Sequence, residues 1–292
     1  MIPSKFDYHA PKTLKKALSL IGEHGDNAKV LAGGHSLIPL MKLRFAAPDV
    51  VIDLGQVGGL SGVRVSKDGT IHIGAMATHH TVESARGLKS KCQLLSETAS
   101  VIGDAQVRNR GTIGGSLVHA DPAADWPAAI LALNAQLEIS SADGSRTVSA
   151  GDFFMDLLTT DIKPGELLTE ITIAVPPANS GGAYEKMHQS ASGFAIAGVA
   201  AQVTLDSSGN CAAAGIGVTG VASVPYRAAA VEAALVGGPF TEDAIAAAAD
   251  KAVDGVDPDD LQGDLHASGE YRVHLAKLFA ARAIARAANL AG

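Results

Sequence analysis

The first half of the chain alternates between helical and strand-like spacing of its apolar residues. Apolar side chains recur every three or four positions over residues 14–21, which predicts a helix that Thr13 can cap. Short apolar runs at residues 29–32, 50–54 and 71–73 predict strands. Helices and strands are therefore expected to follow one another closely in this part of the chain.

A second helical pattern and a hairpin follow in the middle of the chain. Residues 94–102 carry a helical stripe of apolar side chains. Asp121-Pro122 predicts a helix start, because the carboxylate can cap a helix and Pro favours its first position. Asp143-Gly144 predicts a tight turn between strands at residues 137–139 and 146–148.

The stretch from Pro176 to Gly182 is rich in Pro, Ser and Gly and gives the strongest linker signal in the chain. It follows a strand predicted over residues 167–175, so we predict two domains, residues 1–176 and residues 183–292. In the second domain strands are followed by helices, an order that indicates an α+β fold. Its predicted strands cover residues 183–188, 197–205 and 212–218, and its predicted helices cover residues 227–235, 241–252 and 271–290.

Composition describes an ordinary folded protein and narrows the classes of partner. The chain has 292 residues, of which 47% are hydrophobic and 18% charged, and its net charge is −7. An acidic chain lacks the basic surface that nucleic acid requires, so we do not expect nucleic acid as a partner. We expect no transmembrane segment and no signal peptide, because no apolar run is long enough to span a bilayer and the N-terminal residues are mixed.

Cysteine and histidine usage argues against a metal site in this chain. Two cysteines, Cys92 and Cys211, cannot supply the four thiolates that an iron–sulfur cluster usually needs. They also form no disulfide framework, so we expect a cytoplasmic location. His79-His80 resembles a metal-binding pair, but adjacent residues on a strand point to opposite faces. We therefore expect no metal ligands.

Two glycine-rich segments carry the clearest chemical signal. The first is Ala32-Gly33-Gly34-His35-Ser36, and the second is Thr112-Ile113-Gly114-Gly115-Ser116. Adjacent glycines lack Cβ atoms and can adopt positive φ, so their N–H groups can converge on a phosphate without Lys or Arg. Taken alone, the first segment is more simply a tight turn after a strand. As a pair, the two segments fit a diphosphate, which has two phosphates to bind.

Other nucleotide-binding signatures are absent. The chain has no Gly-x-x-x-x-Gly-Lys-Ser/Thr phosphate loop of the kind that binds nucleoside triphosphates. It also lacks the Gly-x-Gly-x-x-Gly fingerprint after its first strand, which argues against a Rossmann domain. A non-catalytic nucleotide-binding or scaffold protein remains an alternative at this point.

The two segments and their surroundings resemble the FAD subunit of the molybdenum hydroxylases, a family that includes carbon monoxide, xanthine and aldehyde dehydrogenases. The resemblance rests on Ala32–Ser36 followed by Leu40-Met41-Lys42-Leu43-Arg44, and on Arg108-Asn109-Arg110-Gly111 leading into the second segment. It continues in order to Tyr271-Arg272 and covers essentially the whole chain.

The resemblance implies a fold and a cofactor. It implies a two-lobed FAD-binding domain of the vanillyl-alcohol-oxidase (PCMH) type, with lobes of about residues 1–55 and 56–176, and then a smaller α+β C-terminal domain. Both glycine segments would hold the FAD diphosphate. We expect Gly114→Val to place a Cβ atom where the phosphate approaches, and so to abolish FAD retention while the fold stays soluble.

The resemblance also implies individual FAD contacts, carried over by position. Asp125 would hold the adenosine portion, Lys186 would lie near the flavin, and Phe194 would lie beside the isoalloxazine. Without the resemblance, Lys186 is equally a solvated strand lysine and Phe194 a core residue. The implied cofactor-binding residues are Lys29, Val30, Leu31, Ala32, Gly33, Gly34, His35, Ser36, Leu37, Ile102, Thr112, Gly114, Gly115, Ser116, Asp125, Leu168, Lys186 and Phe194.

The function implied is electron transfer within a larger oxidoreductase. The chain would be the medium subunit of a heterotrimer, and two heterotrimers would form a heterohexamer. A small subunit would carry iron–sulfur clusters and a large subunit the molybdenum cofactor. Electrons would pass through FAD to an external acceptor, and no catalytic side chain is required of this chain. The alternative is a self-contained flavin-dependent oxidase that acts directly on a small molecule.

The sequence departs from its family at one place and from the carbon monoxide enzymes at two more. Ser116 stands where many members have Asn, and the segment Gln189–Ala195 lacks the basic residues and the Tyr or Trp associated with those enzymes. His119-Ala120-Asp121-Pro122 differs as well. These departures favour the broader group of aldehyde and heterocycle dehydrogenases.

Overall fold

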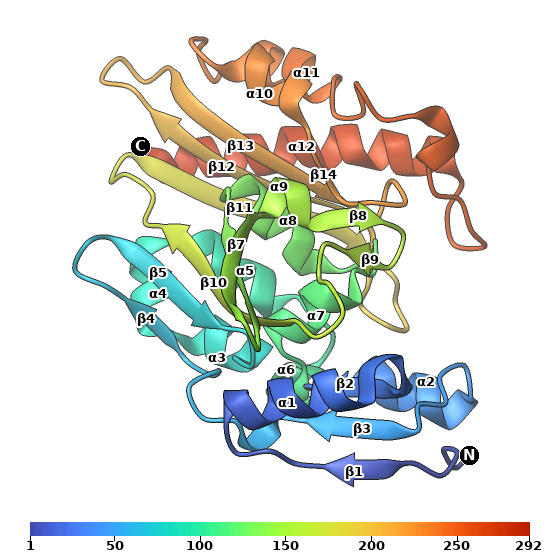
Figure 1. The fold of residues 1–292 in the computed structure, drawn as a ribbon. Coiled ribbons are helices and arrows are strands. Elements are labelled where there is room, and N and C mark those ends of the chain that lie inside the picture. Colours follow the sequence, from blue (N-terminus) through green and yellow to red (C-terminus); the bar gives the residue numbers. More distant parts are fainter.

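The computed structural model describes residues 1–292, and its N-terminal lobe is a small parallel sheet covered by a helix (Figure 1). The strands lie in the order β1-β3-β2, and both outer strands run parallel to β3. The apolar face of α1, including Leu18 and Ile21, packs in one core with Ile52 of the sheet. Thr13 caps α1, because its hydroxyl accepts the Lys16 N–H. The elements are β1 (Asp7–His9), α1 (Leu14–His24), β2 (Ala28–Leu31), α2 (Leu37–Leu43) and β3 (Val50–Asp53).

The middle lobe is built on a five-stranded antiparallel sheet in the order β4-β5-β10-β6-β7. Helices pack around it to form the largest core of the protein, in which Trp126 is fully buried. The elements are β4 (Val63–Val65), β5 (Thr70–Gly74), α3 (His79–Ser84), α4 (Arg86–Lys91), α5 (Gln93–Ser100), α6 (Ala105–Arg110), α7 (Ile113–His119), α8 (Asp125–Ala132), β6 (Gln136–Ser141), β7 (Gly144–Ser149), α9 (Ala150–Phe153), β8 (Phe154–Asp156), β9 (Thr159–Thr160) and β10 (Leu167–Ala174).

The C-terminal domain is a four-stranded antiparallel sheet, β11-β12-β13-β14, with a long helix, α12, packed along it (Figure 1). Neighbouring residues of β11 point to opposite faces of this sheet. Ala183 packs in the core shared with α12, and Tyr184 packs in the core of the middle lobe. The elements are β11 (Ser180–His188), β12 (Ala195–Leu205), β13 (Cys211–Thr219), β14 (Tyr226–Arg227), α10 (Ala229–Leu235), α11 (Glu242–Ala249) and α12 (Gly269–Ala291).

Helix α8 of the middle lobe lies directly on the sheet of the C-terminal domain. A Cβ atom built on Gly217 would lie 2.0 Å from the Ala128 carbonyl oxygen, and one built on Gly215 would lie 2.0 Å from the Ala132 carbonyl oxygen. Only glycine permits a helix backbone to approach a strand this closely. The two domains therefore share an extensive, closely packed interface.

The predicted linker is shorter than its composition suggests. Strand β10 ends at Ala174 and β11 already begins at Ser180, so the last three linker residues are in a strand. A Cβ atom on Gly181 would lie 2.0 Å from the Ala287 carbonyl oxygen of α12. The glycines that indicated a flexible connection instead allow a helix to pack against the strand.

The helix start predicted at Asp121-Pro122 is wrong. Helix α8 begins at Asp125, and the Asp121 carboxylate caps a turn by accepting the Ala123 N–H at 2.8 Å. The predicted helix over residues 227–235 begins at Ala229, because the residues before it pair with β13 as β14. The hairpin turn near Asp143 is confirmed, although Gly144 is already the first residue of β7. No helix is long and apolar enough to cross a membrane.

Candidate functional site

The two glycine segments are brought into direct contact by the fold. A Cβ atom built on Gly33 would lie 2.3 Å from the Arg110 carbonyl oxygen and 2.6 Å from the Gly111 Cα atom. From the other side, a Cβ atom on Gly115 would lie 3.3 Å from the Cβ atom of Ala32. The N-terminal lobe and the middle lobe therefore meet at these glycines, although the contacting residues are 77 or more positions apart in sequence.

The first segment presents a row of unpaired donors. It leads from β2 into α2, and none of the backbone N–H groups from Ala32 to Leu37 donates a hydrogen bond within the chain. Gly34 adopts a φ of 79°, which only glycine reaches without strain. Ser36 precedes α2, and its hydroxyl makes no capping bond. Consecutive free N–H groups at such a turn form an anion-binding concavity.

The second segment uses its donors differently. It forms the start of α7, where the Thr112 hydroxyl accepts the Gly115 N–H at 3.1 Å and the Thr112 carbonyl accepts the Ser116 N–H. The Ile113 and Gly114 N–H groups donate to carbonyls of residues 77 and 75. The two segments are therefore not equivalent: the first offers free backbone donors, and the second offers a tightly fixed glycine surface with the Ser116 hydroxyl.

The sequence predicts that a Cβ atom at position 114 would point toward the phosphate, and this prediction is wrong. A Cβ atom on Gly114 would lie 2.6 Å from both the Cβ atom and the carbonyl oxygen of Ala75, which is in the interior of the middle lobe. The helix start needs glycine here because it docks against the segment that follows β5. The position is therefore constrained by packing inside the protein.

His79 lies beneath the second segment, in helix α3 and not in the strand expected from the sequence. Its backbone N–H donates to the Gly111 carbonyl at 3.0 Å, and its Nδ1 accepts the indole N–H of Trp126 at 3.0 Å. Burial, followed by the nearby His35 and Arg108, lowers the pKa of His79 to about 4. His79 is thus a neutral support of the site, whereas its neighbour His80 is exposed.

Sequence reasoning missed this role of His79. The signal that could have found it is Thr78-x-x-Thr81, because the Thr78 hydroxyl accepts the Thr81 N–H and so marks the helix start. A helix places His79 and His80 about 100° apart, which permits one of them to be buried and the other exposed.

Asp125 and Lys186 meet across the two domains. The Lys186 Nζ atom lies 2.9 Å from Asp125 Oδ2, and the two side chains are only 7% and 4% exposed. The Tyr184 hydroxyl donates to Asp125 Oδ1 at 2.5 Å. Burial raises the pKa of Asp125, while Lys186 and Tyr184 act in the opposite direction. Burial and the nearby Asp125 raise the pKa of Tyr184 well above its usual value, so the phenol stays a donor.

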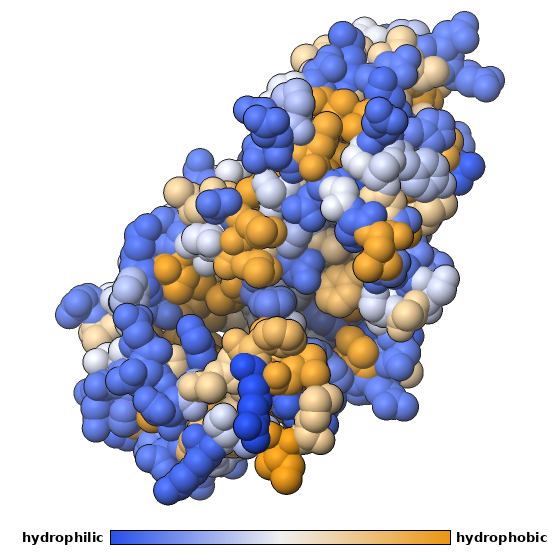
Figure 2. All heavy atoms as spheres, turned by 90° about the vertical axis from the view of Figure 1, so that its right-hand side faces the viewer, coloured by the Kyte–Doolittle hydropathy of each residue, from blue (hydrophilic) through white to orange (hydrophobic).

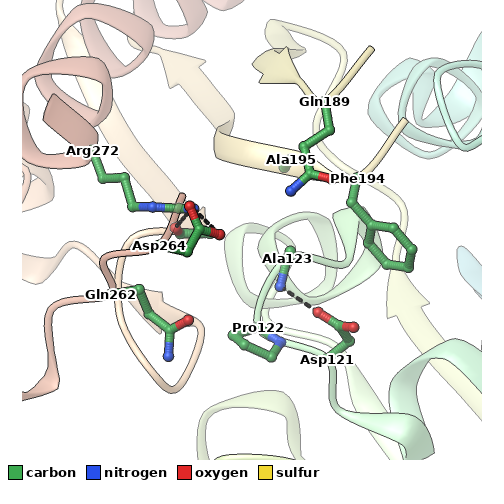
Figure 3. Close-up of a pocket in the computed structure, with 10 residues that line it drawn as sticks. Asp121, Pro122, Ala123, Gln189, Phe194, Ala195, Gln262, Asp264 and Arg272 are labelled. Carbon is green, nitrogen blue, oxygen red and sulfur yellow. Dashed lines mark hydrogen bonds and ion pairs between the residues drawn. The ribbon is translucent and has the colours of Figure 1, made fainter. Parts of the chain in front are cut away.

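Phe194 stands at the edge of a cavity of ≈ 240 Å³ between the middle lobe and the C-terminal domain (Figure 3). Its ring is 39% exposed, so it is not a core residue. Asp264 and Arg272 lie side by side on the opposite side of the view from Gln189 and Phe194, and they form an ion pair at 2.9 Å. The lining residues are Asp121, Pro122, Ala123, Gln189, Phe194, Ala195, Gly220, Gln262, Asp264 and Arg272.

The remaining predicted contacts lie around the two segments. Residues 29–31 belong to β2, which leads into the first segment. Leu168 is buried in β10, and Ile102 packs half-buried against the same core. Thr169, the neighbour of Leu168, accepts the Ala75 N–H, so β10 lies close to the floor beneath Gly114. Residues 29–31 therefore adjoin the first segment and Leu168 lies in the strand near Gly114, while Asp125 and Lys186 are occupied with each other.

Two family descriptions match the chain, one for each domain. The first, "FAD binding domain in molybdopterin dehydrogenase", covers residues 4–176. The chain belongs to the FAD-binding subunits of the molybdenum hydroxylases. The second description, "CO dehydrogenase flavoprotein C-terminal domain", covers residues 182–287 of this flavoprotein subunit.

Similar proteins extend over the full length of this flavoprotein subunit. The carbon monoxide dehydrogenase medium chain of Afipia carboxidovorans is 40% identical, with 98% of each chain covered. The 6-hydroxypseudooxynicotine dehydrogenase complex subunit alpha of Paenarthrobacter nicotinovorans is 38% identical, covering 100% of this chain and 97% of its own. The structure of carbon monoxide dehydrogenase from Oligotropha carboxidovorans superposes with a TM-score of 0.94 at 39% identity, covering 99% and 100% of the two chains.

Membership establishes the fold, the cofactor and the enzyme class of this flavoprotein subunit. The fold is the expected PCMH-type FAD-binding domain followed by a smaller C-terminal domain, and the cofactor is FAD. The enzyme class is the oxidoreductases of the molybdenum hydroxylase family. The free N–H groups after β2 fit an anionic diphosphate, and the contact at Gly33 leaves no room for a side chain at that position.

Proposed function

We propose that this chain is the FAD-binding electron-transfer subunit of a heterotrimeric molybdenum-containing dehydrogenase. Electrons would arrive from iron–sulfur clusters of a small partner subunit and leave through FAD to an external acceptor. The observation that carries the proposal is the first segment, where the N–H groups from Ala32 to Leu37 are unpaired beside the glycine start of α7. A diphosphate accepts such donors without any basic side chain.

The residues of this chain bind and orient the cofactor, and FAD when bound supplies the redox chemistry. We assign the diphosphate to residues 32–37, with Thr112–Ser116 as the opposing surface. Ile102, Leu168 and Phe194 are proposed as apolar contacts. No side chain of this chain needs to act as a nucleophile or a general acid.

The chemistry of the two cysteines supports placing the metal centres in partner subunits. Both thiols are buried, and burial raises the pKa of both, that of Cys92 to about 12, so both stay protonated in the chain at neutral pH. No group of three His, Cys, Asp or Glu side chains is arranged to hold a metal ion. A large subunit would hold the molybdenum cofactor, and two heterotrimers would form a cytoplasmic heterohexamer.

The surface and the relatives both support partner subunits. Figure 2 shows apolar side chains gathered over the N-terminal lobe, where Ile38, Leu43 and Phe45 are exposed. Exposed apolar groups of this kind often belong to interfaces. The names of two relatives, "medium chain" and "complex subunit alpha", describe subunits of larger enzymes. The substrate would then be selected in the partner chain.

The test is to purify the full chain alone and measure its cofactors. We expect about one FAD per chain by absorbance after release, with no iron and no molybdenum by elemental analysis. Coexpression with candidate small and large subunits should give a complex in which added substrate bleaches the flavin. A chain that neither retains FAD nor binds it when it is added would refute the proposal.

The same preparation separates this function from that of a self-contained flavin oxidase. Small aldehydes or N-heterocycles added to the isolated, FAD-loaded chain should leave the flavin oxidised. Reduction of the flavin by such a molecule without partner subunits would instead establish the oxidase.

A further inference from the structure

A buried ion pair joins the two domains next to the cavity beside Phe194. Asp125 is the first residue of α8 in the middle lobe, and Lys186 lies on β11 in the C-terminal domain. In Figure 1, α8 lies beneath the sheet that contains β11. A buried pair of this kind is costly unless both charges are fully hydrogen-bonded, so each contact matters.

Lys186 has a second partner that connects it to Phe194. Its Nζ atom donates to the Gly193 carbonyl at 2.7 Å, in addition to Asp125. Gly193 immediately precedes Phe194 in the turn between β11 and β12. Because the peptide that follows Gly193 is held at its carbonyl, the position of Phe194 depends on Lys186.

Within the turn, residues 189–194 make no hydrogen bond to the middle lobe. The Gln189 N–H donates to the Phe194 carbonyl and the Gly193 N–H donates to the Gln189 carbonyl, so these bonds close the turn on itself. A Cβ atom on Gly193 would lie 3.2 Å from the Gly103 Cα atom. The turn therefore rests on the residue after Ile102. Toward α8 it is held at two points: the Ala195 N–H donates to the Ala123 carbonyl at 3.0 Å after Phe194, and the Lys186 ammonium holds the Gly193 carbonyl before Phe194.

The surroundings of Asp125 are built to hold this pair. The Tyr184 hydroxyl occupies Asp125 Oδ1, while Lys186 occupies Oδ2, so both carboxylate oxygens have partners within the chain. Gly198 pairs with Lys186 across the sheet, and a Cβ atom on it would lie 2.3 Å from the Tyr184 hydroxyl oxygen. The glycine thus leaves space for the tyrosine to reach Asp125.

We propose that Lys186 and Asp125 are positioning residues, which act on the cofactor by fixing the Gly193 carbonyl and thereby placing Phe194. This inference rests on the proposed function, in which Phe194 contacts FAD. It differs from the direct FAD contacts expected for these residues from the sequence. The two roles make different predictions, because a positioning residue loses its effect when the residue that it positions is removed.

The test is a double-mutant cycle on the full-length chain, with FAD affinity as the readout. One change is the paired substitution Lys186→Met/Asp125→Asn, which removes both charges together and so avoids leaving one uncompensated in the interior. The other change is Phe194→Ala. FAD dissociation constants are measured from flavin fluorescence for the wild type, each variant and the combination. Thermal unfolding without FAD identifies any variant that fails to fold.

We expect the paired substitution to weaken FAD binding about threefold to tenfold when Phe194 is present, a range typical of losing one aromatic contact. With Phe194→Ala already in place, the paired substitution should cause no further weakening. The visible circular dichroism of bound flavin should change in the same way in the paired variant and in Phe194→Ala. Lys163→Met, which removes a lysine that pairs with Asp161 on the surface, serves as the control and should bind FAD like the wild type.

Additive losses in the cycle would overturn the inference and assign Lys186 or Asp125 to direct contact with FAD. Unchanged affinity and dichroism in the paired variant would overturn it as well. Either result would leave the proposed function intact, since the wild-type chain still binds FAD. Failure of the wild type to bind FAD would instead refute the proposed function.

Discussion

Gly33 lies against the backbone of Arg110 so closely that a Cβ atom on Gly33 would come within 2.3 Å of the Arg110 carbonyl oxygen. These residues belong to different lobes of the FAD-binding domain. The contact therefore fixes how the free N–H groups of the first glycine segment face the start of α7. We therefore expect a side chain at position 33 to change both the affinity for FAD and the packing of the two lobes.

Gly33→Ala should weaken both lobe packing and FAD binding. Forcing a methyl group into this contact should lower the free energy of unfolding by about 1–3 kcal/mol, because neither backbone can move freely. Urea unfolding of the FAD-free chain and FAD titration measure the two effects. Gly22→Ala is the matched control: no atom lies within 4 Å of its Cβ position, so this helical site should gain up to about 1 kcal/mol. Equal stability of the two variants would contradict the packing argument.

Gly114→Ala should destabilise the chain even when no FAD is present. Its Cβ atom would lie 2.6 Å from Ala75 in the interior, so we expect a loss of about 1–3 kcal/mol, and a larger loss for Gly114→Val. Thermal unfolding of the FAD-free variants is the measurement. A Gly114→Val chain with wild-type stability but no FAD affinity would show that the position acts on the cofactor alone.

Ser36→Ala should weaken FAD binding without affecting the fold. The Ser36 hydroxyl makes no capping bond to α2, so its removal costs no hydrogen bond within the chain. If the hydroxyl donates to the diphosphate, its loss should raise the FAD dissociation constant by about twofold to tenfold. Isothermal titration with FAD, beside thermal unfolding of the FAD-free chain, distinguishes the two effects. A lower melting temperature with unchanged affinity would argue for a structural role.

Gly217→Ala should loosen the contact between the two domains. The new Cβ atom would lie 2.0 Å from the Ala128 carbonyl oxygen, which forces α8 away from β13. We expect a loss of about 2 kcal/mol or more in the free energy of unfolding. Hydrogen exchange of the α8 amides should rise at the same time. Gly209→Ala, in an exposed turn with no atom near its Cβ position, controls for general loss of a glycine, although its φ of 81° adds local strain. Slow exchange in α8 of Gly217→Ala would contradict this prediction.

Stability should fall in mild acid because His79 is buried without charge. Its pKa is about 4 in the folded chain against an ordinary value of 6.5, so between these values the unfolded chain binds more protons. The contribution of His79 to the free energy of unfolding is therefore fully present above pH 6.5. It decreases by up to about 3 kcal/mol as the pH falls toward about 4. Urea unfolding from pH 4.5 to 7.5 measures this slope.

The control for the histidine prediction removes both hydrogen-bond partners. The double variant His79→Leu/Trp126→Phe removes the imidazole and the indole N–H together, so neither is left without its partner. Its free energy of unfolding should depend less steeply on pH than that of the wild type. His80→Gln, at the exposed neighbouring position, should retain the wild-type slope. A wild-type slope in the double variant would assign the acid sensitivity to other groups.

The sequence was informative wherever a local pattern has one physical cause. Residues 14–21 formed the expected helix because their apolar spacing matches its period, and Thr13 capped it with a side chain that can reach the first turn. The glycine pairs predict phosphate-binding segments for a similar reason: their freedom from Cβ atoms is a local property. The order of these motifs along the chain then indicated the family.

The same reasoning failed where a residue type has two uses. Gly181 and Gly182 read as a linker, yet they lie in β11, where Gly181 makes space for α12. Asp121-Pro122 carries the signals of a helix start, but the chain makes a turn there first and α8 begins four residues later. Sequence alone does not distinguish a flexible glycine from one that is pressed against another backbone.

The amino-acid sequence by itself determined the strongly periodic helices and strands, the two glycine segments and the family to which the chain belongs, because periodicity and short motifs are properties of neighbouring residues. Only the tertiary structure decided which donors are free and which are used. It showed that the N–H groups after β2 are unpaired while those at the start of α7 are satisfied, and that Asp125 is paired with Lys186. These facts depend on contacts between distant segments, whose distances no local pattern specifies.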